Sequence, residues 1–269
     1  MSTGIDRINM QIMWNRLIAV VEEQAQTLIR TAFSSMVREC GDLSAGVFDL
    51  DGRMLAQAVT GTPGHVNSMA ESVKHFIDHF PVAEMREGDI YITNDPWMGT
   101  GHIFDISVMR PVFRGEQLIG YTMSITHLPD IGGLGFGAAA TEVFHEGLRL
   151  PICKLASEGT LDQFILELVE TNVRVPDQTI GDLLANVTCN EVGGRQLLEF
   201  MDEYELNDLA PLSCAIRGQS ERAMRDKIAE MANGTYVHEI QIEGVDCLLY
   251  TSDAADEGLG VDLGGRRII

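Results

Sequence analysis

Cysteine is scarce in this sequence, and no two cysteines are closely spaced. The chain has five cysteines in 269 residues, and Cys40, Cys153, Cys189 and Cys214 lie far apart, with Cys247 near the end. The absence of any Cys-x-x-Cys pair argues against a zinc ribbon or a disulfide framework. We expect free, buried thiols in a reducing compartment, which places the protein in the cytoplasm.

Basic residues and long apolar runs are also few. The chain carries 19 Lys and Arg against 40 Asp and Glu, for a formal net charge of -21. Nucleic-acid binding needs clustered Lys and Arg, so the composition argues against it. No uninterrupted apolar run approaches about 18 residues, and the amino terminus lacks an apolar segment flanked by basic residues. We therefore expect no membrane span and no signal peptide.

Two short clusters of histidine and aspartate stand out against this background. Residues 94–105 read NDPWMGTGHIFD, and residues 126–133 read THLPDIGG. Between the clusters, residues 103–113 and 117–127 are strand-like and are separated by Arg-Gly-Glu, a connection typical of a β-hairpin. This turn predicts that residue 103 faces residue 127. Asp105 is then a diagonal neighbour of His127 on one face of the hairpin.

His102 completes this candidate site. It precedes the first strand, where Gly99 and Gly101 give the backbone freedom to turn the imidazole inward. Two imidazoles and a carboxylate are a common ligand set for a catalytic divalent ion. From spacing alone, a surface hydrogen bond is the competing interpretation, and a register error of one residue would move Asp105 to the other face. Four nearby residues are candidates for supporting groups or alternative ligands: Asp130, Glu142, His145 and Glu146.

Three further polar residues are ambiguous in the sequence. His65 follows Pro63-Gly64 at the predicted start of a helix, where a ligand, a substrate contact, a helix cap and a purely structural role are all consistent with it. Asn94 and Asp95 precede Pro96, so they either cap a turn or face a substrate. The segment 132–137, GGLGFG, lacks the Lys-Ser/Thr of a phosphate-binding loop, and we interpret it as a flexible substrate loop.

The remaining pattern predicts an α+β fold, with a mostly antiparallel sheet and long flanking helices. Strand patterns cluster in the first half of the chain and helical patterns in the second. We expect helices over residues 5–37, 66–80, 162–170, 178–205 and 220–231, a hairpin over 45–59 with an Asp-Gly turn, and strands over 89–94 and 235–242.

Several segments taken together resemble one family. They are Trp14–Leu17, Thr27–Ser34, Phe48–Gln57, Gly64–Met69, Asn94–Asp105, His127–Gly133, Thr141–Glu142, Glu146–Pro151 and Asn172–Pro176. In this order they resemble the hydantoinase B/oxoprolinase family, which includes N-methylhydantoinase B and related subunits of acetone and acetophenone carboxylases. The resemblance extends from about residue 5 to about residue 246.

The resemblance implies an ATP-dependent hydrolase that opens a cyclic amide such as a hydantoin or 5-oxoproline. A divalent ion (Mn, Zn or Fe) would be bound at His102, Asp105 and His127, where it would activate water or polarise the substrate carbonyl. ATP would be handled by a partner ATPase subunit of the hydantoinase A type, within a hetero-oligomer. Asp130 or Glu146 is the candidate general base. The candidate substrate-binding residues are His65, Asn94 and Asp95.

Two alternatives stay open at this point. The main alternative within the family is ATP-dependent carboxylation of a ketone, and the hairpin does not separate the two chemistries because both need the same ion. An alternative of another class is a scaffold that docks the ATPase subunit without catalysis of its own. One motif also departs from the family pattern. Many members read His-His-Ala-Asp where this chain has His127-Leu128-Pro129-Asp130, so any role of the second histidine is in doubt.

The end of the chain reads differently from the rest. Residues 247–269, CLLYTSDAADEGLGVDLGGRRII, resemble the translation of a transposon-type sequencing adapter, and we set them aside from fold reasoning. Residues 1–246 then form the part that resembles the family, as one large domain or two small ones. Family members are more than twice as long, so we expect this part to be the amino-terminal fragment of a larger subunit.

Overall fold

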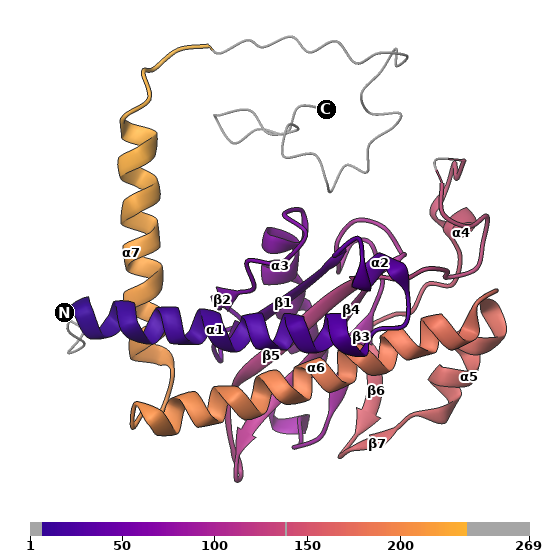
Figure 1. The fold of residues 1–269 in the computed structure, drawn as a ribbon, viewed down its shortest axis with the longest axis horizontal. Helices are drawn as coiled ribbons and strands as arrows, with labels where there is room; N and C mark the ends of the chain where they lie inside the picture. The colour runs from indigo at the N-terminus through magenta and orange to yellow at the C-terminus, as the bar shows by residue number, and fades with distance from the viewer. Residues whose placement is uncertain (1–6, 138, 236–269) are drawn as a thin grey trace.

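A seven-stranded antiparallel sheet forms the centre of the molecule (Figure 1). The computed structural model describes residues 7–137 and 139–235. The strands lie in the order β2-β1-β5-β4-β3-β6-β7. Their bounds are β1 Leu43–Phe48, β2 Met54–Gln57, β3 Ile90–Thr93, β4 Asp105–Arg114, β5 Gln117–His127, β6 Cys153–Ser157 and β7 Thr160–Leu161. The predicted α+β class with a mostly antiparallel sheet is confirmed.

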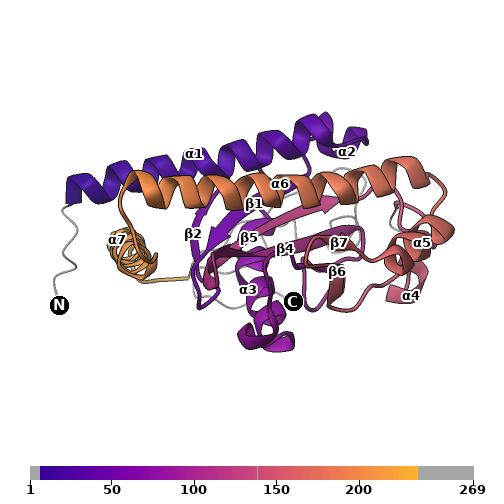
Figure 2. The same cartoon turned by 90° about the horizontal axis from the view of Figure 1, so that it is seen from below.

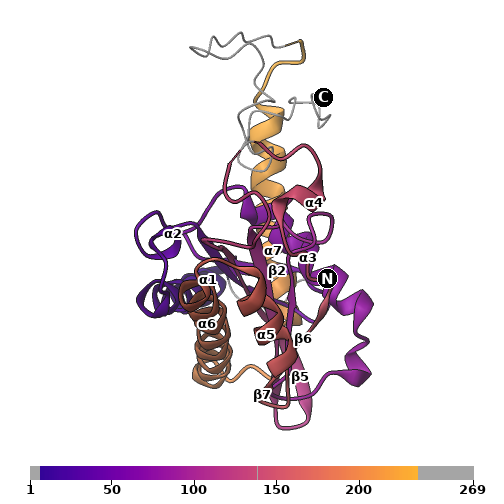
Figure 3. The same cartoon turned by 90° about the vertical axis from the view of Figure 1, so that its right-hand side faces the viewer.

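Helices cover both faces of the sheet. The two longest, α1 (Arg7–Thr31) and α6 (Pro176–Glu203), run side by side across one face (Figure 2). The opposite face carries α3 (His65–His79), so that the sheet lies between α3 and the long pair (Figure 3). The remaining helices are α2 Ser35–Arg38, a short 3-10 turn Val82–Glu84, α4 Val143–Glu146, α5 Gln163–Asn172 and α7 Ala210–Ala229. The long flanking helices were predicted, although α7 begins ten residues before the expected Ser220.

The first helix is shorter than the sequence pattern predicted. The apolar periodicity continues to Val37, but α1 ends at Thr31 and a separate short helix follows. The cause lies on α6, where the Asp182 carboxylate accepts hydrogen bonds from the backbone N–H groups of Phe33 (2.7 Å) and Ser34 (3.1 Å). Ser34 then caps α2 through its hydroxyl. A distant carboxylate therefore ends a helix that local sequence would continue.

A ladder of buried polar side chains joins α6 to the sheet. Asn186 donates to the Thr126 hydroxyl (2.8 Å), and Asn190, one turn further along, donates to the Ser124 hydroxyl (2.7 Å). Gln24 of α1 donates to the Asn190 side-chain oxygen (3.0 Å). Buried amides that hydrogen-bond to specific partners favour one alignment of the packed elements. The ladder therefore fixes both long helices over the end of β5, where His127 lies.

The β4–β5 hairpin forms as predicted, but with a different register. Asp105 pairs directly with His127, where the sequence argument placed residue 103 opposite His127. The turn is one residue tighter than expected, because Arg114 pairs with Gln117, and an irregularity between Val112 and Phe113 adds another residue. The two single shifts add up to two residues. Side chains keep their face when a register shifts by two, so the expected shared face is retained.

Other sequence predictions meet the structure with mixed outcomes. The 45–59 hairpin, the helix after Gly64 and the strand at 89–94 are confirmed as β1–β2, α3 and β3. Strands β6 and β7 were not predicted. Of the four cysteines in the described residues, Cys189 is buried, but Cys153 is half-buried and Cys40 and Cys214 are exposed, so the prediction of buried thiols was wrong for these three. The strand expected at 235–242 and the segment 247–269 lie outside the described residues, apart from Thr235.

No helix in the part of the chain that the structure describes has both the length and the apolar character needed to cross a membrane.

Candidate metal centre

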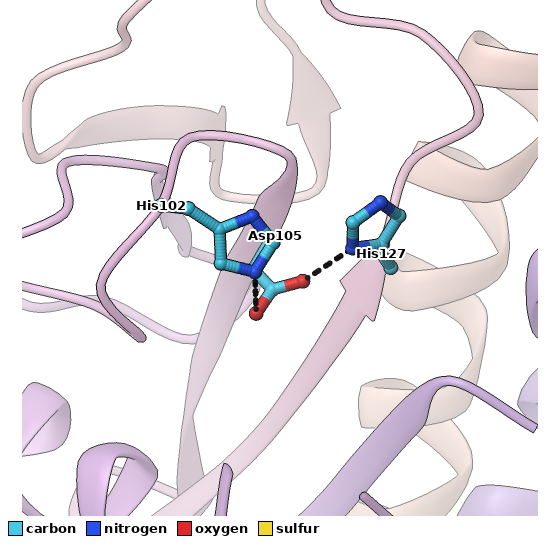
Figure 4. Close-up of side chains that lie close together, drawn as sticks. All are labelled: His102, Asp105 and His127. Carbon is cyan, nitrogen blue, oxygen red and sulfur yellow. Dashed lines mark hydrogen bonds and ion pairs between the residues drawn. The ribbon is translucent and has the colours of Figure 1, made fainter. Parts of the chain in front are cut away.

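Three predicted ligands converge at one end of the β4–β5 pair (Figure 4). The Nε2 atom of His102 lies 2.9 Å from Oδ2 of Asp105, and Nδ1 of His127 lies 3.2 Å from Oδ1 of the same carboxylate. One ligand atom from each residue can be chosen so that all three lie within 4.8 Å of one another. Asp105 and His127 are buried, and His102 is half-buried. The three side chains thus form one compact donor group.

The backbone explains how the three side chains meet. Asp105 is the first residue of β4 and His127 the last of β5, and the two are direct cross-strand partners. Opposed residues on one face of an antiparallel pair place their side chains in contact. His102 enters from the preceding loop, where Gly101 has a φ of 109°, a conformation that L side chains rarely adopt. The prediction that a glycine here turns His102 toward Asp105 is consistent with this geometry.

His65 joins the same carboxylate from the start of α3. Its Nε2 lies 2.9 Å from Asp105 Oδ2, and its Nδ1 lies 3.2 Å from the Ser44 hydroxyl oxygen. All three side chains are buried. Of the alternatives that the sequence left open for His65, the structure therefore places the side chain against the Asp105 carboxylate, with Ser44 of β1 on its other side.

Asp42 is a member of the cluster that sequence reasoning missed. Its carboxylate lies 3.7 Å from Nδ1 of His127 and 3.9 Å from Nε2 of His65, and accepts a hydrogen bond from the Thr62 hydroxyl (2.7 Å). Asp42 precedes β1, which pairs with β5 so that Leu43 faces Thr126. The sequence predicted the β1–β2 hairpin but not its place beside β5. Knowledge of that pairing would have identified Asp42 as the neighbour of His127.

The histidines determine the charge of the central carboxylate. Burial alone would raise the pKa of Asp105, but the hydrogen bonds with the three imidazoles outweigh burial and hold this pKa well below its usual range. Burial would likewise lower the pKa of His65, but the hydrogen bond and negative charge of Asp105, together with Asp42, raise it. Asp105 is consequently an anion at neutral pH, which is the form that binds a cation.

The donor set fits a divalent transition-metal ion. Two imidazoles and a carboxylate suit Zn, Mn or Fe, and they leave coordination positions for other ligands. In addition, Nε2 of His127 is buried and has no hydrogen-bond partner within the described part of the chain. An unpaired buried nitrogen is costly, and coordination to a cation is one arrangement that removes this cost. Thr100 donates a hydrogen bond to Asp105 Oδ2 (2.6 Å), which helps to orient the carboxylate.

The two candidate bases occupy different environments. Asp130 is buried and accepts hydrogen bonds from the Gly132 N–H (3.0 Å), the Arg174 N–H and the Arg174 guanidinium (2.7 Å). Glu146 is half-buried and accepts one hydrogen bond, from the N–H of Ile103, the residue after His102 (3.1 Å). The Asp130 carboxylate is thus bound by one guanidinium and two backbone N–H groups. The Glu146 carboxylate instead accepts a hydrogen bond from the loop that carries His102.

Asn94 and Asp95, the other predicted substrate-binding residues, both bind the local backbone. The Asn94 amide donates to the carbonyl groups of Ile103 (2.7 Å) and Leu148 (2.9 Å) and accepts from the Leu150 N–H (2.6 Å). The Asp95 carboxylate accepts from the Trp97 N–H (3.0 Å). Asn94 therefore connects the loop at His102 to the segment at 148–150. The structure does not bring either residue into the His102–Asp105–His127 group.

Comparisons with known proteins identify the family that the chain resembles. The sequence profile of the family described as "Hydantoinase B/oxoprolinase" matches residues 6–265. The chain is 31% identical to the beta chain of the caprolactamase of Pseudomonas jessenii over 86% of this chain and 40% of that protein. It is 27% identical to the B-type component of a putative D-/L-hydantoinase from a Pseudomonas species over 96% of this chain and 44% of that protein. The chain thus spans less than half the length of either relative.

The fold is also shared with a solved structure. The crystal structure of the ATP-dependent caprolactamase from Pseudomonas jessenii superposes with a TM-score of 0.77 at 29% identity, covering 90% of this chain and 43% of that one. The profile match covers nearly the whole chain and includes His102, Asp105 and His127. We conclude that this chain belongs to the hydantoinase B/oxoprolinase family.

Proposed function

We propose that this chain provides the metal-dependent catalytic centre of an ATP-dependent hydrolase that opens a cyclic amide, of the hydantoinase or 5-oxoprolinase type. The observation that carries the proposal is the convergence of His102 and His127 on the buried carboxylate of Asp105. A hetero-oligomer in the cytoplasm is part of the proposal. Exposed thiols at Cys40 and Cys214 are compatible with a reducing compartment.

The relatives support the choice of a cyclic amide. A caprolactamase and a hydantoinase are both named for substrates that contain an amide within a ring, and the solved caprolactamase is described as ATP-dependent. This chain's glycine-rich segment 132–137 lacks the Lys-Ser/Thr of a phosphate-binding loop. We therefore assign ATP to a partner subunit of the hydantoinase A type, and the small carbonyl substrate to this chain.

The residues of the centre would divide the chemistry among them. A divalent ion held by His102, Asp105 and His127 supplies Lewis-acid polarisation of a carbonyl, or a water of lowered pKa. Asp105 contributes the negative charge. We assign the general base to Glu146 rather than to Asp130, because the Asp130 carboxylate is held by Arg174 and Gly132, whereas Glu146 accepts one hydrogen bond.

The proposal is tested on the full-length subunit co-expressed with its ATPase partner. Metal content and ATP-dependent consumption of hydantoin, caprolactam and 5-oxoproline are measured for the parent and for His102→Ala, Asp105→Ala and His127→Ala. We expect each variant to lose both the metal and turnover. His145→Ala is the matched control, because His145 in α4 is more exposed and pairs with Glu142 (3.1 Å). Full metal retention in the three variants would overturn the proposed site.

The same experiment separates the rival functions. ATP-dependent incorporation of bicarbonate into acetone by the parent, without consumption of a cyclic amide, would make this chain part of a ketone carboxylase. Binding of the ATPase partner without any turnover, in a protein that retains no metal, would make it a scaffold. Each result excludes the hydrolase assignment by a different observable.

A further inference from the structure

A glycine-rich segment places two large apolar side chains in solvent near the metal centre. Residues 132–137 alternate glycine with Leu134 and Phe136, whose exposed fractions are 61% and 74%. Exposed apolar side chains that stand singly are common on protein surfaces, so exposure alone does not assign a role. The neighbourhood of each side chain indicates whether it has a specific role.

The base of this segment is held firmly. The Arg174 guanidinium donates to the carbonyl groups of Gly132 (3.2 Å) and Gly133, and the Leu134 N–H donates to the carbonyl of His145 (2.8 Å). Gly132 and Gly133 have φ values of 89° and 55°, so the chain reverses in conformations that glycine adopts readily. The segment therefore leaves its anchored base in a defined direction, toward β5.

Phe136 lies against the ring of a metal-site histidine. Its ring centroid is 5.2 Å from that of His127 at an interplanar angle of 88°, and 5.9 Å from that of Phe104 at 76°. Phe104 is buried and stacks on His127 at 5.3 Å and 12°. These are favourable edge-to-face and stacked arrangements of aromatic rings. Two phenyl rings thus enclose His127, and most of the Phe136 surface is open to solvent beside the buried centre.

The enclosed histidine gives an independent indication of a ligand. His127 is 5% exposed, and its Nε2 atom is buried without a hydrogen-bond partner in the described residues. Leu134 is exposed on the same segment, and its backbone N–H donates to the carbonyl of His145. Phe136, whose ring lies against that of His127, is placed where a molecule at the centre would be touched.

The charges around the centre are unfavourable for an anionic substituent. Asp42 and Asp105 are carboxylates of the cluster itself. The nearby cations have other partners. Arg174 binds Asp130 and the loop carbonyls, and Arg149 lies 3.9 Å from Asp95 and 5.9 Å from the centre of the Trp97 ring. Apart from the divalent ion, which the amide carbonyl would occupy, a carboxylate on the substrate would meet like charges and no uncommitted guanidinium among these groups.

We infer that Phe136, together with Phe104, forms an apolar wall that selects cyclic amides with an uncharged, hydrocarbon-rich ring over those that carry a carboxylate. This inference rests on the proposed function, because it concerns the substrate of the same centre. Phe136 is a specificity-determining residue in this assignment. The methylene groups of a lactam ring lie against its face, while the amide points to the polar centre.

The test compares two ligands that differ in one group. 2-Pyrrolidone and 5-oxoproline have the same five-membered lactam ring, and only the latter carries a carboxylate. Their binding to the metal-loaded full-length complex is measured by saturation-transfer NMR titration, and KM is measured with ATP. The variants are Phe136→Ala and, as the matched control, Leu134→Ala from the same segment. Metal content is measured in every sample.

We expect 2-pyrrolidone to bind more tightly than 5-oxoproline to the parent. Phe136→Ala weakens 2-pyrrolidone binding and raises its KM by about three- to tenfold, in keeping with the loss of one aromatic contact. Leu134→Ala leaves both unchanged, and the metal content stays at the parental value. Phe136→Arg supplies a cation at the same place and shifts the preference toward 5-oxoproline.

Failure of the inference differs from failure of the proposed function. The specificity assignment is overturned if the metal-loaded parent converts 5-oxoproline and 2-pyrrolidone with equal efficiency. It is also overturned if Phe136→Ala and Leu134→Ala bind 2-pyrrolidone with the same affinity. Both results leave the metal centre in place. A parent that binds neither ligand overturns the specificity assignment as well. A parent protein that contains no bound metal, in contrast, contradicts the proposed function itself.

Discussion

Two buried carboxylates, Asp89 and Asp105, lie toward opposite ends of the β3–β4 strand pair and illustrate two uses of a buried charge. Asp89 accepts hydrogen bonds from the backbone N–H groups of Arg86 (2.9 Å) and Glu158 (3.1 Å). It also binds the Lys154 ammonium (2.7 Å) and the Tyr91 hydroxyl (3.0 Å). These four donors hold one carboxylate in one geometry.

Asp105 has a different set of partners. The donors that contact it in the described residues are side chains, namely three imidazoles and the hydroxyl of Thr100. Both carboxyl groups have lowered pKa values, although burial alone would raise them. The lowered pKa therefore does not distinguish a metal site from a structural ion pair. The chemistry of the partners does, because imidazoles bind metals and a lysine ammonium does not.

The largest effect should come from exchanging each carboxylate for an amide. Asp89→Asn should lower the free energy of unfolding by about 3–5 kcal/mol, because it leaves Lys154 without its buried partner. Metal content should not change, whereas Asp105→Asn should abolish metal binding. Urea unfolding and metal analysis of both variants test this contrast. Asp51→Asn, at an exposed ion pair, is the control, and a stability loss for Asp89→Asn as small as the control's would contradict the structural role.

Acid should remove the contribution of Asp89. A carboxyl group with a lowered pKa in the folded state stabilises the fold above the pKa of the unfolded chain, near 4, and loses this effect as the pH falls through the folded-state value. The difference in unfolding free energy between the parent and Asp89→Asn should therefore be largest at neutral pH and shrink below about pH 4. Urea titrations at several pH values measure it, and a difference that is constant down to pH 2 would refute the assignment.

Removing the hydrogen bond between His65 and Asp105 should have a smaller effect on metal binding than Asp105→Asn. His65→Asn removes the hydrogen bond to Asp105 and the contact with Ser44 while keeping a polar side chain. Outer partners of metal ligands typically contribute about 10–100-fold to metal affinity, and we expect a loss in this range. A competition titration with a chelator measures it. The exposed His79 lies on the same helix, so His79→Asn should bind metal as the parent does.

Thr100→Val should have the smallest effect. The change removes the hydroxyl that donates to Asp105 but conserves the shape of the side chain. The hydroxyl is one neutral donor, and the three imidazoles that remain on Asp105 compensate in part for its loss. We expect metal affinity to fall by less than it does in His65→Asn. If Thr100→Val lost more metal affinity than His65→Asn, Thr100 rather than His65 would be the more important partner of Asp105.

Local sequence could predict the site better than it could predict the sheet around it. The three ligands belong to one hairpin, so turn length and side-chain alternation sufficed, and a register wrong by two residues still gave the correct face. Asp42 and the end of α1 depend on contacts between distant segments. The pairing of β1 with β5 places Asp42 beside His127, and Asp182 ends α1 from 148 or more residues away. No local pattern contains this information.

The short sequence span of the candidate metal ligands has a consequence for the order in which the protein is made. His102, Asp105 and His127 belong to one hairpin region, and Asp42 and His65 precede it, so every residue of the cluster leaves the ribosome before any part of α5, α6 or α7. Hairpins form within microseconds, far faster than translation adds residues. The nascent chain can therefore hold the candidate metal ligands together while the helices that later cover the other face of the sheet are still being synthesised.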